Sequence, residues 1–184
     1  MIITAESNNA SSLPKNTDFF DSLNVKHLSV ERTWVNIGDD CFSPKSNATD
    51  VHVDTMYCNG THGQSMGSIG QYAGEKSIIE DVVIENIWML NSQFGARLKS
   101  WAGPNVGYGY INNVTFRNFW NANNEYAAYL DSCYFNVSTS PPATLSLIPA
   151  PFHTPFRAVP RHVAESQPHN NRSTQRRVPR TPHR

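Results

Sequence analysis

The sequence predicts an all-β chain whose short strands stack as successive coils of a parallel β-helix. Four segments share one pattern, in which alternating apolar residues are followed by a polar position and then an aromatic residue; they are 27–34, 50–57, 81–88 and 113–120. This alternation is typical of a strand with one buried face. The segments start roughly 23 to 32 residues apart, a period that indicates stacked repeats. We find no long, capped helical pattern.

Each segment is predicted to be one strand, and the stretches between them, rich in Asn, Gly and Ser, are predicted to be turns. Repeated short strands are also found in sandwiches and propellers. Two features favour the solenoid. Tight Asn-Gly hairpin signals are nearly absent between the repeats, and Asn and Thr near equivalent strand ends could form ladders from coil to coil.

Composition excludes several classes of function. Fifteen Lys and Arg balance fifteen Asp and Glu, so the chain lacks the basic excess expected of a nucleic-acid-binding protein. No apolar run is long enough to cross a bilayer, so we expect no membrane partner. The first residues lack the basic and apolar regions of a secretory signal.

The chain changes character near residue 138. We predict a β-helical region over 1–138 and a disordered, Pro- and Arg-rich tail over 139–184. The tail holds nine of the twelve prolines, and Glu165 is its one acidic residue. Dense proline cannot continue a central strand. The alternatives are a basic binding tail, or a segment that is not a native continuation of the domain.

The cysteines and Asn sequons bear on the compartment. An odd number of cysteines (Cys41, Cys58 and Cys133) leaves at least one without a partner in the chain. A Cys41–Cys58 disulfide would suit an oxidising compartment, and three buried thiols a reduced one. Asn-x-Ser/Thr sequons are consistent with a secreted glycoprotein; they start at Asn9, Asn47, Asn59, Asn113, Asn136 and Asn171.

Two adjacent carboxylates, Asp39 and Asp40 in WVNIGDDCFSPK, are candidates for acid–base chemistry. Neighbouring carboxylates repel, and this raises one pKa. Asp18 precedes Asp39 by 21 positions, and His62 follows Asp40 by 22. If a coil takes about that many residues, these side chains lie on neighbouring strands, roughly 5 Å apart.

Two cations complete this candidate site. Arg97 and Lys99 follow His62 by about one longer coil and, being two apart on a strand, share one face. Three carboxylates, an imidazole and two cations would suit glycoside hydrolysis, in which one carboxylic acid protonates the leaving oxygen and another carboxylate activates water. Fixed Arg and Lys would bind an anionic sugar.

Each residue also has a simpler interpretation. An Asp pair in a turn is usually solvated, a His in a Gly-rich turn is usually structural, and Arg97 and Lys99 could form a solvated face. Cys41, Cys58 and His62 match no familiar zinc-ligand spacing. The joint register of the six side chains therefore carries the functional argument, and we expect no metal or organic cofactor.

Four motifs in order resemble the polygalacturonases, glycoside hydrolase family 28. They are NTD (16–18), GDDC (38–41), GTHGQSMGS (60–68) and RLK (97–99), and the similarity runs from about Ile2 to Asn136. The stretch CNGTHGQSMGSIGQYAGE is similar to the fungal exo-acting members. The resemblance implies a right-handed parallel β-helix and hydrolysis with inversion of configuration.

The resemblance also implies roles for single residues. Asp39 would be the general acid, Asp18 and Asp40 would activate the water, and His62 would support the acid. Arg97 and Lys99 would bind the galacturonate carboxylate, and Tyr126 would contact the substrate one coil beyond Lys99. The family pairing also implies a Cys41–Cys58 disulfide.

The chain departs from the family pattern in three ways. Phe19 follows the NTD aspartate where the family usually has glycine, and RLK replaces RIK. Family members have several further coils on both sides, so we expect an incomplete β-helix, missing N- and C-terminal coils, in which Cys133 has lost its partner.

The function expected from the resemblance is that of a secreted, monomeric exo-polygalacturonase-like hydrolase acting on pectin. The alternatives are an exo-rhamnogalacturonan hydrolase on the same fold, or an inactive truncated β-helix that only binds pectin.

Overall fold

The computed structural model describes residues 1–9, 11–12 and 14–135, which form two five-stranded sheets with parallel pairing throughout. The long-strand sheet has the order β1 (Ile2–Thr4), β3 (Val25–Asn36), β5 (Ala48–Asn59), β7 (Lys76–Leu90) and β9 (Tyr108–Ala122). The short-strand sheet has the order β10 (Tyr126–Tyr134), β8 (Phe94–Trp101), β6 (Gly63–Ile69), β4 (Asp40–Pro44) and β2 (Phe20–Ser22).

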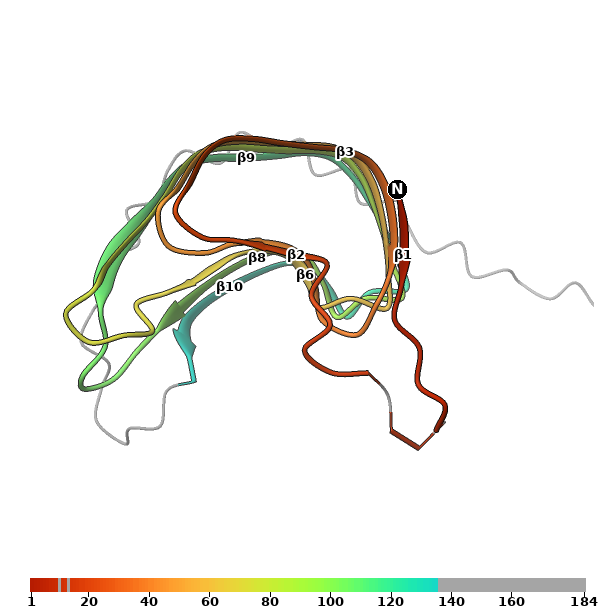
Figure 1. Cartoon of the computed structure of the whole chain (residues 1–184), viewed down its shortest axis with the longest axis horizontal. Coiled ribbons are helices and arrows are strands. Elements are labelled where there is room, and N and C mark those ends of the chain that lie inside the picture. The colour runs from red at the N-terminus through yellow and green to blue at the C-terminus, as the bar shows by residue number, and fades with distance from the viewer. Residues whose placement is uncertain (10, 13, 136–184) are drawn as a thin grey trace, which may run out of the picture.

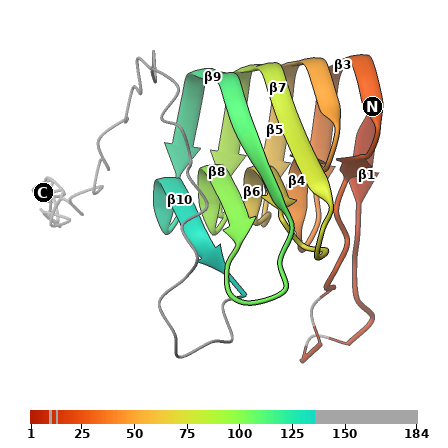
Figure 2. The same cartoon turned by 90° about the vertical axis from the view of Figure 1, so that its left-hand side faces the viewer.

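Successive strands alternate between the two sheets, so the chain winds through about four turns of a solenoid. Figure 1 looks down this solenoid, with the long strands curving over the top and the short strands facing them below. Figure 2 shows the same coils side by side. Alternation between sheets together with parallel pairing confirms the predicted β-helix, as opposed to a sandwich or propeller.

The four segments predicted as strands lie inside β3, β5, β7 and β9. Their aromatic residues are in register, because Trp34 pairs with Tyr57, Tyr57 with Trp88, and Trp88 with Trp120. The rings of Tyr57 and Trp88 stack with centroids 4.3 Å apart, and those of Trp88 and Trp120 stack at 4.5 Å. The alternate residues point inward and are almost fully buried between the sheets, including Val35, Val53, Met56, Ile84, Ile87 and Phe116.

The long strands bend at two levels that repeat from coil to coil. Residues at these levels have positive φ angles: His27, Asp50, Asp81 and Asn113 at one, Arg32, Thr55, Asn86 and Asn118 at the other. Asn and Asp tolerate this left-handed backbone better than most other residues. Their side chains also bond along the solenoid axis, as when Asn118 Nδ2 donates to Asn86 Oδ1 at 3.0 Å. These bends give the curvature seen in Figure 1.

An asparagine ladder runs along the ends of the long strands, where the chain turns toward the short-strand sheet. Asn59 donates to Asn36 at 2.6 Å, Asn91 to Asn59 at 2.7 Å, and Asn123 to Asn91 at 2.9 Å. These amide bonds confirm the predicted ladder. They also hold the turns that follow Asn36 and Asn59, and those turns carry the candidate site.

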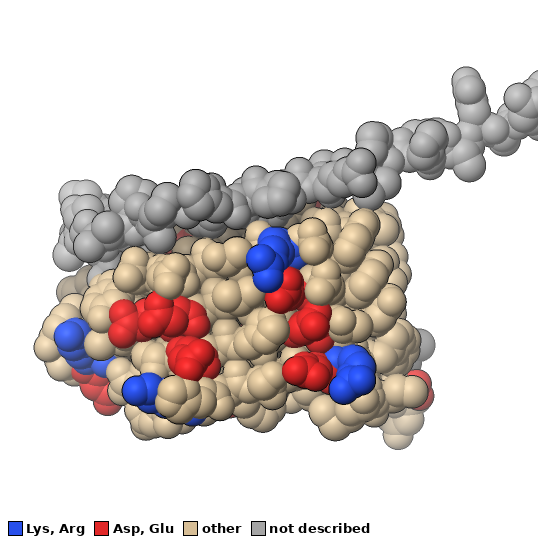
Figure 3. Space-filling view, turned by 90° about the horizontal axis from the view of Figure 1, so that it is seen from above, with Lys and Arg blue, Asp and Glu red and all other residues tan. Residues whose placement is uncertain are grey.

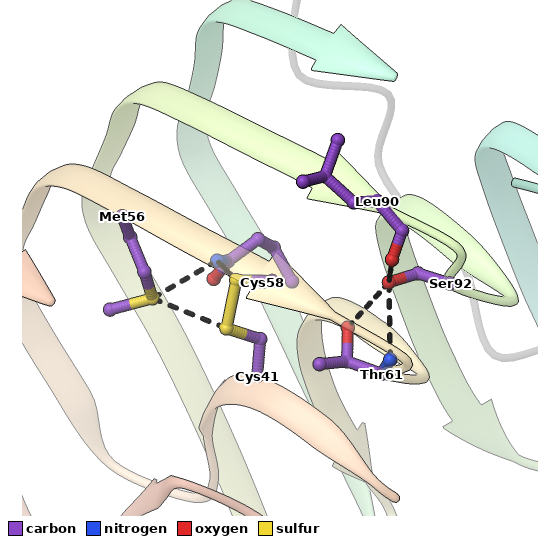
Figure 4. Close-up of a disulfide and its surroundings, with 7 residues drawn as sticks. Cys41, Met56, Cys58, Thr61, Leu90 and Ser92 are labelled. Carbon is purple, nitrogen blue, oxygen red and sulfur yellow. Dashed lines mark hydrogen bonds between the residues drawn. A yellow bond between two sulfur atoms is a disulfide. The ribbon is translucent and has the colours of Figure 1, made fainter. Parts of the chain in front are cut away.

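A Cys41–Cys58 disulfide joins β4 to β5, as predicted, with Cα atoms 6.0 Å apart (Figure 4). Figure 4 also shows the hydrogen bond between the Thr61 and Ser92 hydroxyl groups, 3.0 Å long, which links the next two turns. Cys41 directly follows Asp40, so the disulfide anchors the start of the strand that carries the acid pair. Cys133 is a free, exposed thiol.

Charges on the outer face of the long-strand sheet are mixed. Arg117 Nε donates to Glu85 at 2.6 Å, and His52 contacts the same carboxylate at 2.8 Å. Figure 3 shows acidic and basic side chains interspersed on this face. Within the described ranges, no helix is long and apolar enough to cross a membrane. The predicted disordered tail, 139–184, lies outside the described residues.

Candidate active site

The three predicted acids lie where the chain enters strands of the short-strand sheet. Asp40 is the first residue of β4, Asp39 precedes it, and Asp18 lies two residues before β2. Phe20 pairs with Phe42, and continuing this register by two residues places Asp18 level with Asp40. The His62 N–H donates to the Asp39 carbonyl at 2.8 Å, which sets His62 beside Asp39.

The sequence placed these side chains on neighbouring strands with a coil of 21 or 22 residues, and the structure instead brings Asp18 level with Asp40 and His62 beside Asp39. On the His62 side, the extra residue comes from a β-bulge. Asp40 pairs with Gly63 while Phe42 pairs with Gln64, so β4 holds one residue more than β6 at this point. A bulge re-aims neighbouring side chains, and sequence spacing alone does not reveal it.

Asp39 is hydrogen-bonded to the imidazole that the sequence predicted as its neighbour. His62 Nδ1 lies 3.1 Å from Asp39 Oδ1, and the Asp40 N–H donates to the same oxygen at 2.8 Å. Burial raises the pKa of Asp39, but these two hydrogen bonds and the charges of His62 and Lys99 outweigh it, so the pKa lies below its usual value. The bond to Asp39 raises the pKa of His62.

Asp40 and Lys99 form a buried ion pair that spans β4 and β8. Their exposed fractions are 1% and 5%, and Lys99 Nζ lies 2.5 Å from Asp40 Oδ2. The other oxygen accepts a hydrogen bond from Ser65 Oγ at 2.6 Å. Gly67, which pairs with Lys99, lies in the intervening strand, and a Cβ there would lie 2.5 Å from the Lys99 carbonyl. A larger residue would therefore push β8 and its lysine away.

Asp18 lies close to three other carboxylates. Burial, together with the charges of Asp21, Asp39 and Asp40, raises its pKa to about 6. These four carboxylates line one hollow of about 240 Å³ together with Lys45 and Lys99, and we call it the acidic hollow. Its remaining lining residues are Asn16, Ser68, Gln71, Trp101, Tyr134 and Phe135.

Arg97 lies beside the acidic hollow, but its immediate partners are aromatic. Its guanidinium carbon is 4.3 Å from the Phe94 ring centroid and 5.2 Å from that of Tyr134. Arg97 Nη2 lies 3.6 Å from Asp131 Oδ2. The residue is 7% exposed, and its buried Nε has no hydrogen-bond partner among the described residues.

Tyr126 lies one coil beyond Lys99, in the strand that pairs with β8. It begins β10 and pairs with Phe94, and it is 52% exposed. The residues level with Arg97 and Lys99 are Tyr129 and Asp131. Tyr126 is absent from the lining of the acidic hollow.

The structure also brings in residues that the sequence interpretation did not include: Asp21, Lys45, Trp101, Asp131 and Tyr134. One signal was available for Asp131. The 32-residue offset between segments 81–88 and 113–120, applied to the RLK motif, leads to Tyr129 and Asp131. Asp21 and Lys45 belong to no motif and are recruited only by folding.

A metal at this site would have to displace existing partners. One ligand atom each from Asp39, Asp40 and His62 lies within 4.8 Å of the others. Lys99 and Ser65 already occupy the two oxygens of Asp40, and Asp39 and His62 bind each other. Cys41 and Cys58 are joined in a disulfide, so neither can ligate a metal as a thiolate beside His62.

Two further hollows lie beside His62. One, of about 550 Å³, is shared by Asp39 and His62 with the segment Pro14 to Asn16. The other, of about 350 Å³, lies between His62 and the turn that holds Asn91 to Gln93. Asp39 lines the acidic hollow and the first of these two, and His62 lines both of these two.

The fold and the site together define a class: parallel β-helix proteins that carry a cluster of carboxylates and cations on one sheet. The chain belongs to the glycosyl hydrolases family 28, whose sequence model matches residues 1–148.

Individual relatives agree with this assignment. The chain is 63% identical over 138 residues to the probable exopolygalacturonase B of Aspergillus terreus, and 56% identical over 138 residues to the exopolygalacturonase B of Aspergillus niger. Each alignment covers 75% of this chain and 32% of the relative, so the chain spans about a third of the length of these curated relatives.

A solved structure has the same fold. The endo-xylogalacturonan hydrolase from Aspergillus tubingensis superimposes with a TM-score of 0.69 at 32% identity, covering 73% of this chain and 36% of that one.

Proposed function

We propose that the chain carries the hydrolytic centre of an exo-polygalacturonase-like enzyme that releases galacturonic acid from the non-reducing ends of pectin chains. The observation that carries the proposal is the convergence of Asp18, Asp39 and Asp40 on one hollow, beside an imidazole and a buried ammonium group. The similarity to exopolygalacturonases supports exo action.

In the proposed reaction, Asp39 protonates the leaving oxygen while Asp18 and Asp40 activate a water on the opposite face of the sugar. Inversion requires room for that water between the carboxyl groups. In the free chain Asp18 and His62 take up protons before Asp39 as the pH falls, because their pKa values are raised and that of Asp39 is lowered. A bound uronate would exclude water and add a negative charge, and both effects raise the pKa of Asp39.

The cations are proposed to hold the substrate. Arg97 lies beside Tyr134 of the hollow and would bind the sugar carboxylate. Lys99 is paired with Asp40 but also lines the hollow. Because an ammonium group has three N–H donors, Lys99 could bind the sugar carboxylate as well. Tyr126 is exposed at the Phe94 end of β10 and would contact a more distant sugar of the pectin chain.

Hydrolysis is tested by release of reducing sugar from polygalacturonate, with chromatography to identify the product. We expect monomeric galacturonic acid, initially formed with inverted anomeric configuration in proton NMR spectra. Asp39→Asn should lower kcat by about 100-fold or more, as expected for loss of general acid catalysis. Asp50→Asn, an exposed outer-face control in contact with His27, should leave kcat unchanged.

Products other than the monomer would refute exo action, and equal rates for Asp39→Asn and the unaltered chain would refute the mechanism. Faster turnover of rhamnogalacturonan would favour the alternative exo-rhamnogalacturonan hydrolase. Binding of pectin without turnover, unchanged in Asp39→Asn, would favour an inactive binding protein.

We further propose that the protein acts outside the cell as a monomer, on pectin in the plant cell wall. The Cys41–Cys58 disulfide suits an oxidising compartment. Mass spectrometry of secreted protein, before and after glycosidase treatment, would test both secretion and the predicted glycosylation.

A further inference from the structure

We propose that Lys45 is a specificity-determining residue whose ammonium group binds the carboxylate of a uronic acid in the acidic hollow, in the place that Asp21 occupies in the free chain. The inference rests on the proposed function for its substrate class. It adds a cation that belongs to none of the motifs of the sequence analysis.

The position of Lys45 is fixed by its neighbours. It directly follows β4, and its backbone N–H donates to the Ser22 carbonyl at 2.7 Å, which ties it to the preceding coil. Its Nζ donates to Ser43 Oγ at 2.7 Å and to the Gly67 carbonyl at 3.3 Å. Two of its three donors thus hold the ammonium group at the wall of the hollow.

The third partner of Lys45 is weakly held. Asp21 Oδ2 lies 3.3 Å from Nζ, and the Asp21 side chain is 43% exposed. Exposed ion pairs of this kind contribute little stability. Asp40 lies farther away, at 4.0 Å, and is already bonded to Lys99 and Ser65. An incoming carboxylate therefore competes only with Asp21.

Accessibility distinguishes the two lysines of the hollow. The Lys99 side chain is 6% exposed and paired with a buried carboxylate, whereas that of Lys45 is 26% exposed. Four carboxylates face these two cations, so an anionic sugar is repelled unless a cation is free to meet it. Lys45 is therefore the more accessible cation of the hollow.

This arrangement selects for charge on the sugar. A galacturonate carboxylate can accept a charge-assisted hydrogen bond from Lys45, and such bonds are roughly twice as strong as neutral ones. A methyl ester offers neutral oxygens and cannot repel Asp21. Lys45 should therefore favour the free acid over its ester.

The experiment is calorimetric titration of the whole chain with digalacturonate and, separately, with its methyl ester. We expect the unaltered chain to prefer the acid and Lys45→Met to reduce that preference about tenfold, the loss expected for one charged hydrogen bond. Asp21→Asn removes the competing charge and should strengthen acid binding. Lys26→Met, an equal charge change at an exposed outer-face residue, should leave the preference unchanged.

An unchanged preference in Lys45→Met would overturn the inference, as would the absence of any acid preference in the unaltered chain. If Lys45→Met fails to fold by near-ultraviolet circular dichroism, Asp21→Asn decides, because weaker or equal acid binding in that variant contradicts the competition. A chain that prefers the acid through Lys45 yet releases no sugar refutes the proposed function only. A chain that hydrolyses pectin with its preference unaltered refutes this inference only.

Discussion

Replacement of Lys99 by Met should destabilise the fold by leaving the Asp40 carboxylate buried without its main partner. Asp40 is 1% exposed and Lys99 5% exposed, so water cannot replace the lost ammonium group. Removing one partner of a buried ion pair typically costs about 3–5 kcal/mol, most of it the penalty for the charge left behind.

The structure places the expected value at the lower end of that range. Ser65 Oγ still donates to Asp40 at 2.6 Å, and Lys45 Nζ lies 4.0 Å away. We therefore expect the free energy of unfolding to fall by about 3 kcal/mol. Asp40→Asn should cost a similar amount, because Lys99 is then the unpaired buried charge.

A double-mutant cycle with urea unfolding, followed by far-ultraviolet circular dichroism, measures the coupling. Because the variant Lys99→Met/Asp40→Asn leaves neither charge uncompensated, it should be more stable than the sum of the two single losses by about 2 kcal/mol. Strictly additive losses, or a Lys99→Met loss below about 0.5 kcal/mol, would refute the buried pair.

Three further predictions concern stability, each measured by urea unfolding. The pKa of Asp18 is about 6 in the folded chain and 3.8 in the unfolded chain. Its stabilising contribution is therefore complete below pH 3.8 and is lost as the pH rises through 6. Asp18→Asn should accordingly be more stable than the unaltered chain by about 1 kcal/mol at neutral pH and should differ little from it at about pH 3.5. Replacing Cys41 and Cys58 together by Ser opens a loop with a sequence separation of 17 and should cost about 3 kcal/mol, and a loss that persisted when both proteins were reduced would contradict this. Gly38→Ala would place a Cβ 2.2 Å from the Pro14 carbonyl and should cost about 1–3 kcal/mol, whereas a neutral result would mean that this segment is not packed against the turn.

Much of the fold followed from local pattern. Alternation in the segments 27–34, 50–57, 81–88 and 113–120 identified four long strands, because one face of each is buried and the other is not. The short strands were harder to predict. All five residues of β4 are buried, so its sequence has no alternation to distinguish a strand from any other buried segment.

The candidate site was only partly accessible to sequence reasoning. Spacing brought Asp39 and His62 together, because the turns between those coils are short. The resemblance placed Tyr126 one coil beyond Lys99 but did not give its level, and the structure pairs it with Phe94 at the start of β10. Asp21 and Lys45 were missed, because neither stands out by residue type or spacing.

By itself, the sequence determined the solenoid, its period and the set of acids, imidazole and cations. These depend on side-chain periodicity and motif order, which are properties of the chain read along its length. The tertiary structure alone decided which charges meet. The bulge at Cys41 set the register of the acid pair, burial locked Asp40 to Lys99, and the coil contacts turned Lys45 toward Asp21. Those pairings depend on offsets of one residue and on depth from solvent, and residue order encodes neither directly.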